Sequence, residues 1–278
     1  MAIITIARQI GSMGSEIAAD VAQRLHYTLV DDTKLQTAAE SYGMLKSELE
    51  KVHEKRPTLV GRYLAMRHRA YLDMIQMIIY HYARQDDVVI LGRGATALLS
   101  DVPTALHVNI FSPYDRRVEV VMARQGIARS LAKQLVRESD QDRARYMRYF
   151  FDRDWMDPLL YDVMINTGVI TRELACDLIV EAARAKELLE AHDRALEILD
   201  NHILVRKAEE ALLRAKQVNP RHVSVAVMTP GVVKLTGIAN SEKEKLAVEA
   251  VVRELPGVRD VENELYVTMA AIDHLDFV

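Results

Sequence analysis

The stretch Ile3-Ile-Thr-Ile-Ala-Arg-Gln-Ile-Gly-Ser-Met-Gly-Ser-Glu-Ile17 decides the fold of this chain. Its first part, Ile3–Ala7, is an apolar run of strand length, and the residues from about Ser15 to Leu25 carry apolar side chains at helical spacing. Between them lie Gly11 and Gly14, which let backbone N–H groups turn toward an anion at the start of a helix. The stretch predicts a strand, a phosphate-binding turn and a helix. A plain tight connection is the alternative.

Strand and helix patterns alternate through the first two thirds of the chain. Further strands are predicted at 27–30, 88–91, 106–111 and 162–165, and helical sequence fills the intervals up to Tyr82 and through Phe151. Strands separated by helices form parallel sheets that helices cover on both faces. The fold predicted for this part of the chain is therefore α/β.

The sequence from Val169 to Asn219 contains neither Gly nor Pro. Leu, Ala, Glu, Lys and Arg dominate it, so we expect a helix, with a restart at an Asp200 cap as one option. A rigid connection is favoured over a flexible one.

A second, smaller pattern follows Pro220. It predicts strands at 223–227 and 232–237 around the turn Thr229-Pro-Gly231, and a third strand at 258–267. Ser241 is predicted to cap a helix that buries one face. The side chains expected on that face are Leu246, Ala250, Val251 and Leu255. These elements make a small module with a core of its own.

Length and composition limit the possible classes of protein. The 278 residues exceed the roughly 100–200 of a typical single domain, so two cores are expected. No apolar run approaches the roughly 20 residues of a membrane span, and the first residues read as a strand rather than a signal peptide, so the cytoplasm is expected. A net charge of -4 argues against nonspecific nucleic-acid binding as the main activity. The single cysteine, Cys176, is interpreted as a small core residue.

A second candidate site is Gly92-Arg93-Gly94, which directly follows the buried strand at 88–91. Ligands of open α/β sheets bind at the carboxyl ends of strands, and Arg makes bidentate contacts to phosphate. A surface Arg in a turn is the alternative interpretation.

A third candidate is the Arg-rich segment from Arg124 to Arg153, which includes Arg143. Phosphoryl transfer needs cations because charge spreads over the transferred group's oxygens. Solvated helix faces with i,i+4 ion pairs have the same composition, so this reading also stays open.

Taken in order, these elements resemble the cytidylate kinase-like family, relatives of bacterial cytidylate kinase among the P-loop nucleoside monophosphate kinases. The resemblance covers roughly residues 1–184. It rests on Ile4–Ala18, Val30-Asp-Asp32, Val89–Ala95, Asp140–Tyr146, Trp155 and Tyr161–Thr167.

The resemblance implies a P-loop kinase-type domain at 1–190 that uses ATP and Mg²⁺. The ATP phosphates would bind at Gly11, Ser12, Met13, Gly14, Ser15 and Glu16, and the acceptor at Asp31, Asp32, Gly92, Arg93, Gly94 and Asp140. Asp32 is the candidate for the magnesium site, and Arg8, Arg93 and Arg143 are the candidate catalytic residues. The family often shows G-S-G-G-R-E without the P-loop Lys; this chain has Met13 for Gly and Ser15 for Arg. Arg8 is the cation that could replace the missing Lys.

The region 191–278 is expected to hold a helical connection and a module that resembles a BON domain, with its core at about 200–269. That resemblance rests on Val223–Val227, Gly231–Gly237, Ser241 and Leu255–Val267. A small ligand, a protein and a membrane surface remain open as its partners, and a regulatory or interaction role in the cytoplasm fits best.

The predicted function is ATP-dependent phosphorylation of CMP or a similar nucleoside monophosphate. The alternative is a nucleotide-binding regulator without transfer activity that signals through the BON-like module. A third reading, surface binding through that module alone, leaves the first pocket unused. Nucleotide is the expected partner, nucleic acid is not, and self-association stays open.

Overall fold

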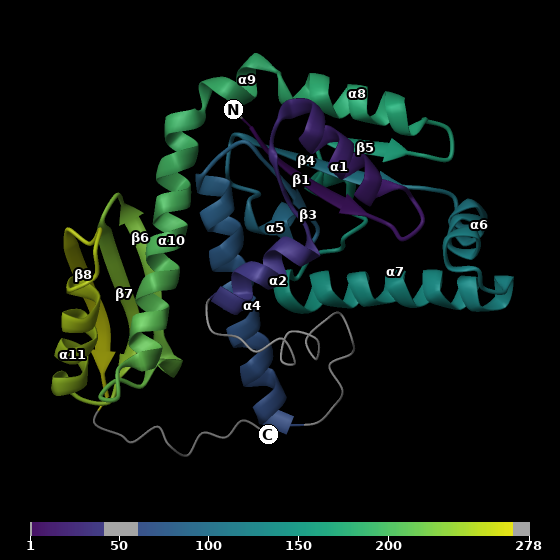
Figure 1. Cartoon of the computed structure of the whole chain (residues 1–278). Coiled ribbons are helices and arrows are strands. Elements are labelled where there is room, and N and C mark those ends of the chain that lie inside the picture. Colours follow the sequence, from purple (N-terminus) through teal and green to yellow (C-terminus); the bar gives the residue numbers. More distant parts are fainter. Residues whose placement is uncertain (1, 42–60, 269–278) are drawn as a thin grey trace. The chain divides into compact units, whose positions relative to one another are not determined.

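The structure is a computed structural model that describes residues 2–41 and 61–268 (Figure 1). The predicted helical sequence at 42–60, and Met269 at the end of the predicted BON-like core, lie outside the described residues. The chain separates into two compact units, Met1–Ala195 and Leu196–Val278.

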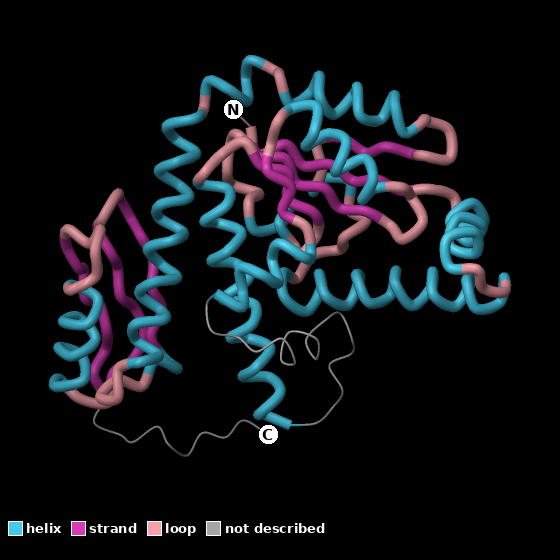
Figure 2. The backbone as a smooth tube through the Cα atoms, viewed as in Figure 1, coloured by secondary structure: helices cyan, strands magenta, loops and turns pink. Residues whose placement is uncertain are grey.

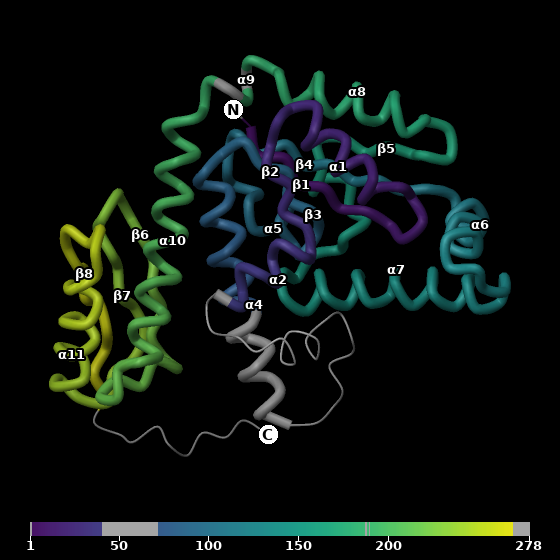
Figure 3. The backbone as a smooth tube through the Cα atoms, viewed as in Figure 1, coloured from purple at the N-terminus to yellow at the C-terminus, as the bar shows by residue number. Residues whose placement is uncertain are grey.

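The first unit contains a parallel sheet of five strands in the order β2-β3-β1-β4-β5, which confirms the predicted α/β fold (Figure 2). The first strand of the chain, β1, lies at the centre of the sheet, between β3 and β4, which both come later in the chain (Figure 3). The strands are β1 (Ile3–Arg8), β2 (Thr28–Val30), β3 (Val88–Leu91), β4 (Ala105–Phe111) and β5 (Val163–Asn166).

Helices cover the sheet on both faces, as apolar strands buried on both sides require. Figure 1 shows α1 and α8 on one side of the sheet and α7 on the other. The helices of this unit are α1 (Gly14–Leu25), α2 (Asp32–Ser41), α4 (Gly61–Arg84), α5 (Ala95–Leu98), α6 (Tyr114–Gln125), α7 (Arg129–Phe151), α8 (Arg172–Ala183) and α9 (Lys186–Glu190).

The two faces of the sheet differ in chemistry. On one face Ile4, Ile6 and Val108 form a single apolar core with side chains of α1 and α8. Residues alternate between faces along a strand, so Thr5 and Ala7 of β1 point to the opposite face, which carries polar groups. The candidate site lies on this second face.

The stretch from Val169 to Asn219 is mostly helical, as predicted, but it forms three helices and does not restart at Asp200. Backbone at Ala185 leaves the helical region (φ -58°, ψ 133°) between α8 and α9, and Asp200 lies inside α10 (His192–Arg214) rather than at a cap. Leu188 of α9 packs on the same core as α8, so the chain bends there without Gly or Pro. Tertiary packing overrides local helix propensity at this point.

The second unit has the predicted order of elements. It holds β6 (Val223–Thr229), β7 (Val232–Ala239), α11 (Glu242–Arg253) and β8 (Asp260–Val267), with β6-β7 antiparallel and β7-β8 parallel. Side chains of α10 and α11 share one apolar core with β7 and β8. The predicted cap is confirmed, because the Ser241 hydroxyl accepts a hydrogen bond of 3.1 Å from the Glu244 backbone N–H.

The predicted face of α11 is buried in part, because Val251 and Leu255 are partly buried and pack against the apolar core. Val248 and Val252 are fully buried, whereas Leu246 is 63% exposed and Ala250 is also exposed. The two buried valines are four residues apart and lie on one helix stripe. The apolar residues of this helix fit more than one stripe, and the position of the sheet selects the one that is buried.

Within the described ranges, no helix is both long enough and apolar enough to cross a membrane.

Candidate functional site

A pocket lies at the carboxyl ends of β1 and β3, on the polar face of the sheet. The turn between β3 and α5 forms one wall, and α7 with the segment after it forms another. Three arginines and three aromatic side chains line it. The lining residues are Ala7, Arg8, Gly92, Arg93, Gly94, Ala95, Thr96, Arg143, Tyr146, Met147, Trp155 and Tyr161.

The predicted phosphate turn between β1 and α1 has an anion-binding backbone. Gly11 (φ 77°) and Met13 (φ 63°) adopt left-handed conformations, and Met13 caps α1 without a side-chain hydrogen bond. The first N–H groups of a helix have no intrahelical acceptor, so they are available to an anion. The Ser12 hydroxyl is buried and donates to the Gln9 and Ile110 carbonyls, so the exposed hydroxyl of the turn is that of Ser15.

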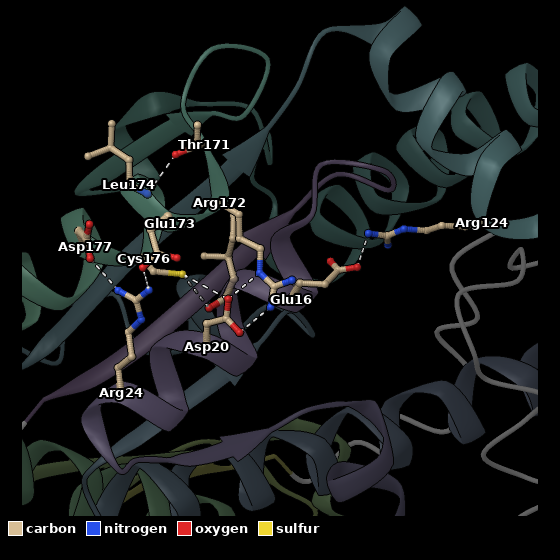
Figure 4. A network of polar contacts seen from close by, with 11 residues as sticks. Glu16, Asp20, Arg24, Arg124, Thr171, Arg172, Glu173, Leu174, Cys176 and Asp177 are labelled. Atoms are coloured by element: carbon tan, nitrogen blue, oxygen red, sulfur yellow. Dashed lines mark hydrogen bonds and ion pairs between the residues drawn. The ribbon is translucent and has the colours of Figure 1, made fainter.

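The carboxylate of Glu16 is engaged beside the turn rather than open to a phosphate. It forms an ion pair with Arg124 at the end of α6 (Figure 4). One turn further along α1, Asp20 accepts two hydrogen bonds of 2.6 Å from Arg172 of α8, and these lower the pKa of Asp20. Arg24 completes the network by pairing with Glu173 and Asp177. These ion pairs connect α1, the helix that follows the phosphate turn, to α6 and α8.

Arg8 joins the phosphate turn to the Gly92-Arg93-Gly94 turn. A Cβ atom added at Gly14 would lie 2.5 Å from the Arg8 Cβ, and one at Gly92 would lie 2.2 Å from its Nη1. Both glycines are therefore needed to accommodate the arginine side chain. Sequence reasoning selected all three residues, but only the structure shows that they form one unit.

Asp32 lies between two of the arginines. Its Oδ1 accepts a 2.8 Å hydrogen bond from Arg93 Nε, and its Oδ2 is 3.8 Å from Arg8 Nη2. A divalent cation on this carboxylate would be placed beside two guanidinium groups. Within the ranges that the structure covers, no cluster of three or more acidic, His or Cys side chains could hold a metal ion. As arranged, the Asp32 carboxylate orients the guanidinium of Arg93.

The carboxyl-terminal end of α7 lies over the Gly92-Arg93-Gly94 turn. The Tyr146 hydroxyl donates to the Arg93 carbonyl at 3.3 Å, and a Cβ at Gly94 would meet the Phe151 ring at 2.3 Å. Arg143 lines the pocket one turn before Tyr146 and donates to the Ser139 carbonyl at 3.3 Å. The structure thus brings Arg8, Arg93 and Arg143 to one pocket.

Two aromatic residues that follow α7, Trp155 and Tyr161, also line the pocket. The Tyr161 hydroxyl donates to the Trp155 carbonyl at 2.6 Å, and burial raises the pKa of Tyr161 to about 12, so its phenol is neutral at physiological pH. Sequence reasoning noted both residues as parts of motifs but did not place them in a site. Aromatic residues next to an Arg-rich segment were the available signal.

Three predicted acceptor residues, Asp31, Asp32 and Asp140, have other partners and do not line the pocket. Both carboxylate oxygens of Asp140 bind the guanidinium of Arg117, at 3.0 and 2.8 Å. The Asp31 carboxylate accepts a 2.9 Å hydrogen bond from the Lys34 backbone N–H and so caps α2. Asp140 thus supports α7, which carries the pocket residues Arg143 and Tyr146.

Comparison with known proteins agrees with this geometry. Residues 3–169 match the cytidylate kinase-like family, and residues 200–269 match the BON domain.

Among solved structures, an uncharacterized protein from Eubacterium ventriosum is similar in fold, with a TM-score of 0.53 and 22% identity over 67% of this chain and 100% of that one. Shikimate kinase from Bacteroides thetaiotaomicron gives a TM-score of 0.41 and 14% identity over 66% of this chain and 99% of that one. Uronate isomerase from Corynebacterium glutamicum is 32% identical over 104 residues, which is 37% of this chain and 20% of the length of that protein.

Proposed function

This chain belongs to the cytidylate kinase-like family, and from that premise we propose that it transfers the terminal phosphoryl group of ATP to CMP or a similar nucleoside monophosphate. One observation carries the proposal: Arg8 lines a pocket with Arg93, Arg143 and aromatic walls, and its Cβ lies against Gly14 at a helix start with the backbone of an anion site. Arginines suit phosphates and aromatic faces suit a nucleobase.

On the donor side, the β- and γ-phosphates of ATP would bind the N–H groups of Gly14, Ser15 and Glu16. Magnesium that arrives with ATP would supply positive charge that offsets part of the charge on the phosphates. Glu16 does not oppose this binding, because Arg124 pairs with its carboxylate. The Arg8 side chain begins beside Gly14 of the phosphate turn and places its guanidinium at Gly92. From there it would supply the positive charge that a P-loop Lys gives in related kinases.

On the acceptor side, Arg93 would bind the phosphate of the nucleoside monophosphate, with Asp32 orienting its guanidinium. An oxygen of that phosphate forms a bond to the γ-phosphorus of ATP as the bond to the β–γ bridging oxygen breaks. The products are ADP and a nucleoside diphosphate. Arg8 and Arg143 stabilise the charge on the transferred group, and the aromatic walls exclude water.

We propose a domain of residues 1–190 for this reaction and a helical connection with a BON-like module in 191–278. The module would act in regulation or interaction, and its partner would be a small ligand, a protein or a membrane surface. An ATP-dependent kinase of nucleotides would work in the cytoplasm.

The test is a coupled ADP-release assay with ATP, Mg²⁺ and each nucleoside monophosphate in turn. We expect turnover that depends on the acceptor and is lost in Arg93→Ala. Arg145→Ala is the matched control, because Arg145 is an exposed residue of α7 that pairs with Asp142.

A specific observation favours a second function: Ser15 stands where the family has Arg, and the P-loop Lys is absent. Nucleotide-induced thermal stabilisation without turnover would therefore favour this second function, a nucleotide-binding regulator, over the kinase. If no nucleotide changes the melting temperature, both functions are refuted.

A further inference from the structure

A buried amide lies in the sheet beside the pocket. Asn109 of β4 is 0% exposed, and neither its Nδ2 nor its Oδ1 atom has a hydrogen-bond partner among the described residues. Leaving such groups unpaired costs free energy, and the great majority of buried polar side chains in native proteins are paired. The exception at Asn109 therefore needs a physical explanation.

Strand register places this amide next to the pocket. Asn109 pairs directly with Ala7 of β1 on one side and with Met164 of β5 on the other. Paired residues of neighbouring parallel strands point to the same face and lie about 4.8 Å apart. Ala7 lines the pocket, and its side chain is only a methyl group. The Asn109 amide therefore lies on the pocket face, at the carboxyl end of the sheet where ligands of α/β folds bind.

The polar groups one step deeper on the same face are all satisfied. Thr5 pairs in register with His107, and the Thr5 hydroxyl bonds to His107 Nδ1 at 2.8 Å and to the Thr96 hydroxyl at 3.1 Å. Burial lowers the pKa of His107, so its ring is neutral in this closed network. The sheet thus provides internal partners for every polar side chain in that row and none for Asn109.

We infer that Asn109 is a substrate-binding residue whose amide hydrogen-bonds to the nucleobase of the acceptor, an inference that rests on the proposed function. A side-chain amide offers a donor and an acceptor in one plane. A pyrimidine edge with an adjacent donor and acceptor has the complementary pattern. Because the amide can turn over, Asn109 can pair with such an edge on any nucleobase, so it would position the base rather than select cytosine or uracil. Arg93 would bind the phosphate of the same molecule.

The test measures binding and stability on the same variants. Trp155 is the one tryptophan of the chain and lines the pocket, so its fluorescence reports acceptor binding without turnover. Asn109→Leu replaces the amide with an apolar group of similar size. We expect the Kd for CMP and UMP to rise at least about tenfold, because the base edge loses its partner. The unfolding midpoint should stay unchanged or rise, because an unpaired amide has been removed.

Ribose 5-phosphate, which has a phosphate and a sugar but no base, separates base recognition from phosphate binding. We expect Asn109→Leu and the wild type to bind it equally. Thr5→Val is the matched control: it removes a paired hydroxyl from the same face, so it should lower the unfolding midpoint and leave CMP binding unchanged. Should the leucine prevent folding, Asn109→Ala must show the same separation of binding and stability.

Equal CMP affinity in the wild type and the Asn109 variants would overturn this inference alone. Equal losses for CMP and ribose 5-phosphate would also overturn it, because the amide would then not contact the base. If the wild type binds no nucleoside monophosphate, the proposed function fails together with the inference.

Discussion

Removing the carboxylate of Asp140 should destabilise the first unit strongly, because it leaves the Arg117 guanidinium buried without a counter-ion. Arg117 is 4% exposed, and its two terminal nitrogens bind the two Asp140 oxygens at 3.0 and 2.8 Å. Breaking a buried pair costs about 3–5 kcal/mol. The Asp140 side chain is 27% exposed, so water can partly replace it, and we expect about 2–3 kcal/mol for Asp140→Ala.

The loss of stability in the first unit can be followed separately in the full chain. Trp155 is the one tryptophan of the chain and is 6% exposed, so its fluorescence in a urea titration reports the unfolding of this unit. For a unit of this size each kcal/mol shifts the melting temperature by about 2–4 °C, so Asp140→Ala should lower it by roughly 5–10 °C.

Asp142→Ala is the matched control on the same helix. Asp142 lies 3.5 Å from the exposed Arg145, and an exposed ion pair contributes about 0–1 kcal/mol. The double variant Arg117→Leu/Asp140→Leu removes both charges and should recover part of the stability. A loss in Asp140→Ala no larger than in Asp142→Ala would refute the reasoning, since Arg117 would then not depend on Asp140.

Three further predictions concern other parts of the first unit. The hydrogen bonds from Arg172 lower the pKa of Asp20, so this pair stabilises the fold above the unfolded-state pKa near 3.8 and is lost as the pH falls through the lower folded-state value. Asp20→Asn should therefore lower stability at neutral pH and flatten its decline below about pH 4 in an acid titration. Burial raises the pKa of the Cys176 thiol to about 11. A disulfide reagent at pH 8 should therefore label this thiol slowly in the native protein and at once in denaturant. Rapid labelling of the native protein would contradict the burial of Cys176. Gly94→Ala should abolish CMP binding and lower stability by about 1–3 kcal/mol, because its φ of 74° is strained for alanine and the new methyl would meet an aromatic ring at 2.3 Å. Gly126→Ala has a similar φ with nothing within 4 Å of the new methyl, so it should leave CMP binding unchanged.

Local sequence determined the elements that frame the site. The apolar run at Ile3–Ala7, the glycines after it and the apolar helix spacing led directly to β1, the phosphate turn and α1. The strand predicted at 88–91 and the Ser241 cap have the same basis. Periodicity, turn chemistry and capping act over a few residues, so the order of residues already contains them.

Only the tertiary structure decided which distant residues meet. Arg8 reaches Gly92, Asp140 binds Arg117, and Asn109 lies beside Ala7 without a hydrogen-bond partner among the described residues. These relations depend on strand order, register and the packing of α7. All of them are set by the burial of apolar surface across the whole unit, and no local pattern in the sequence encodes them.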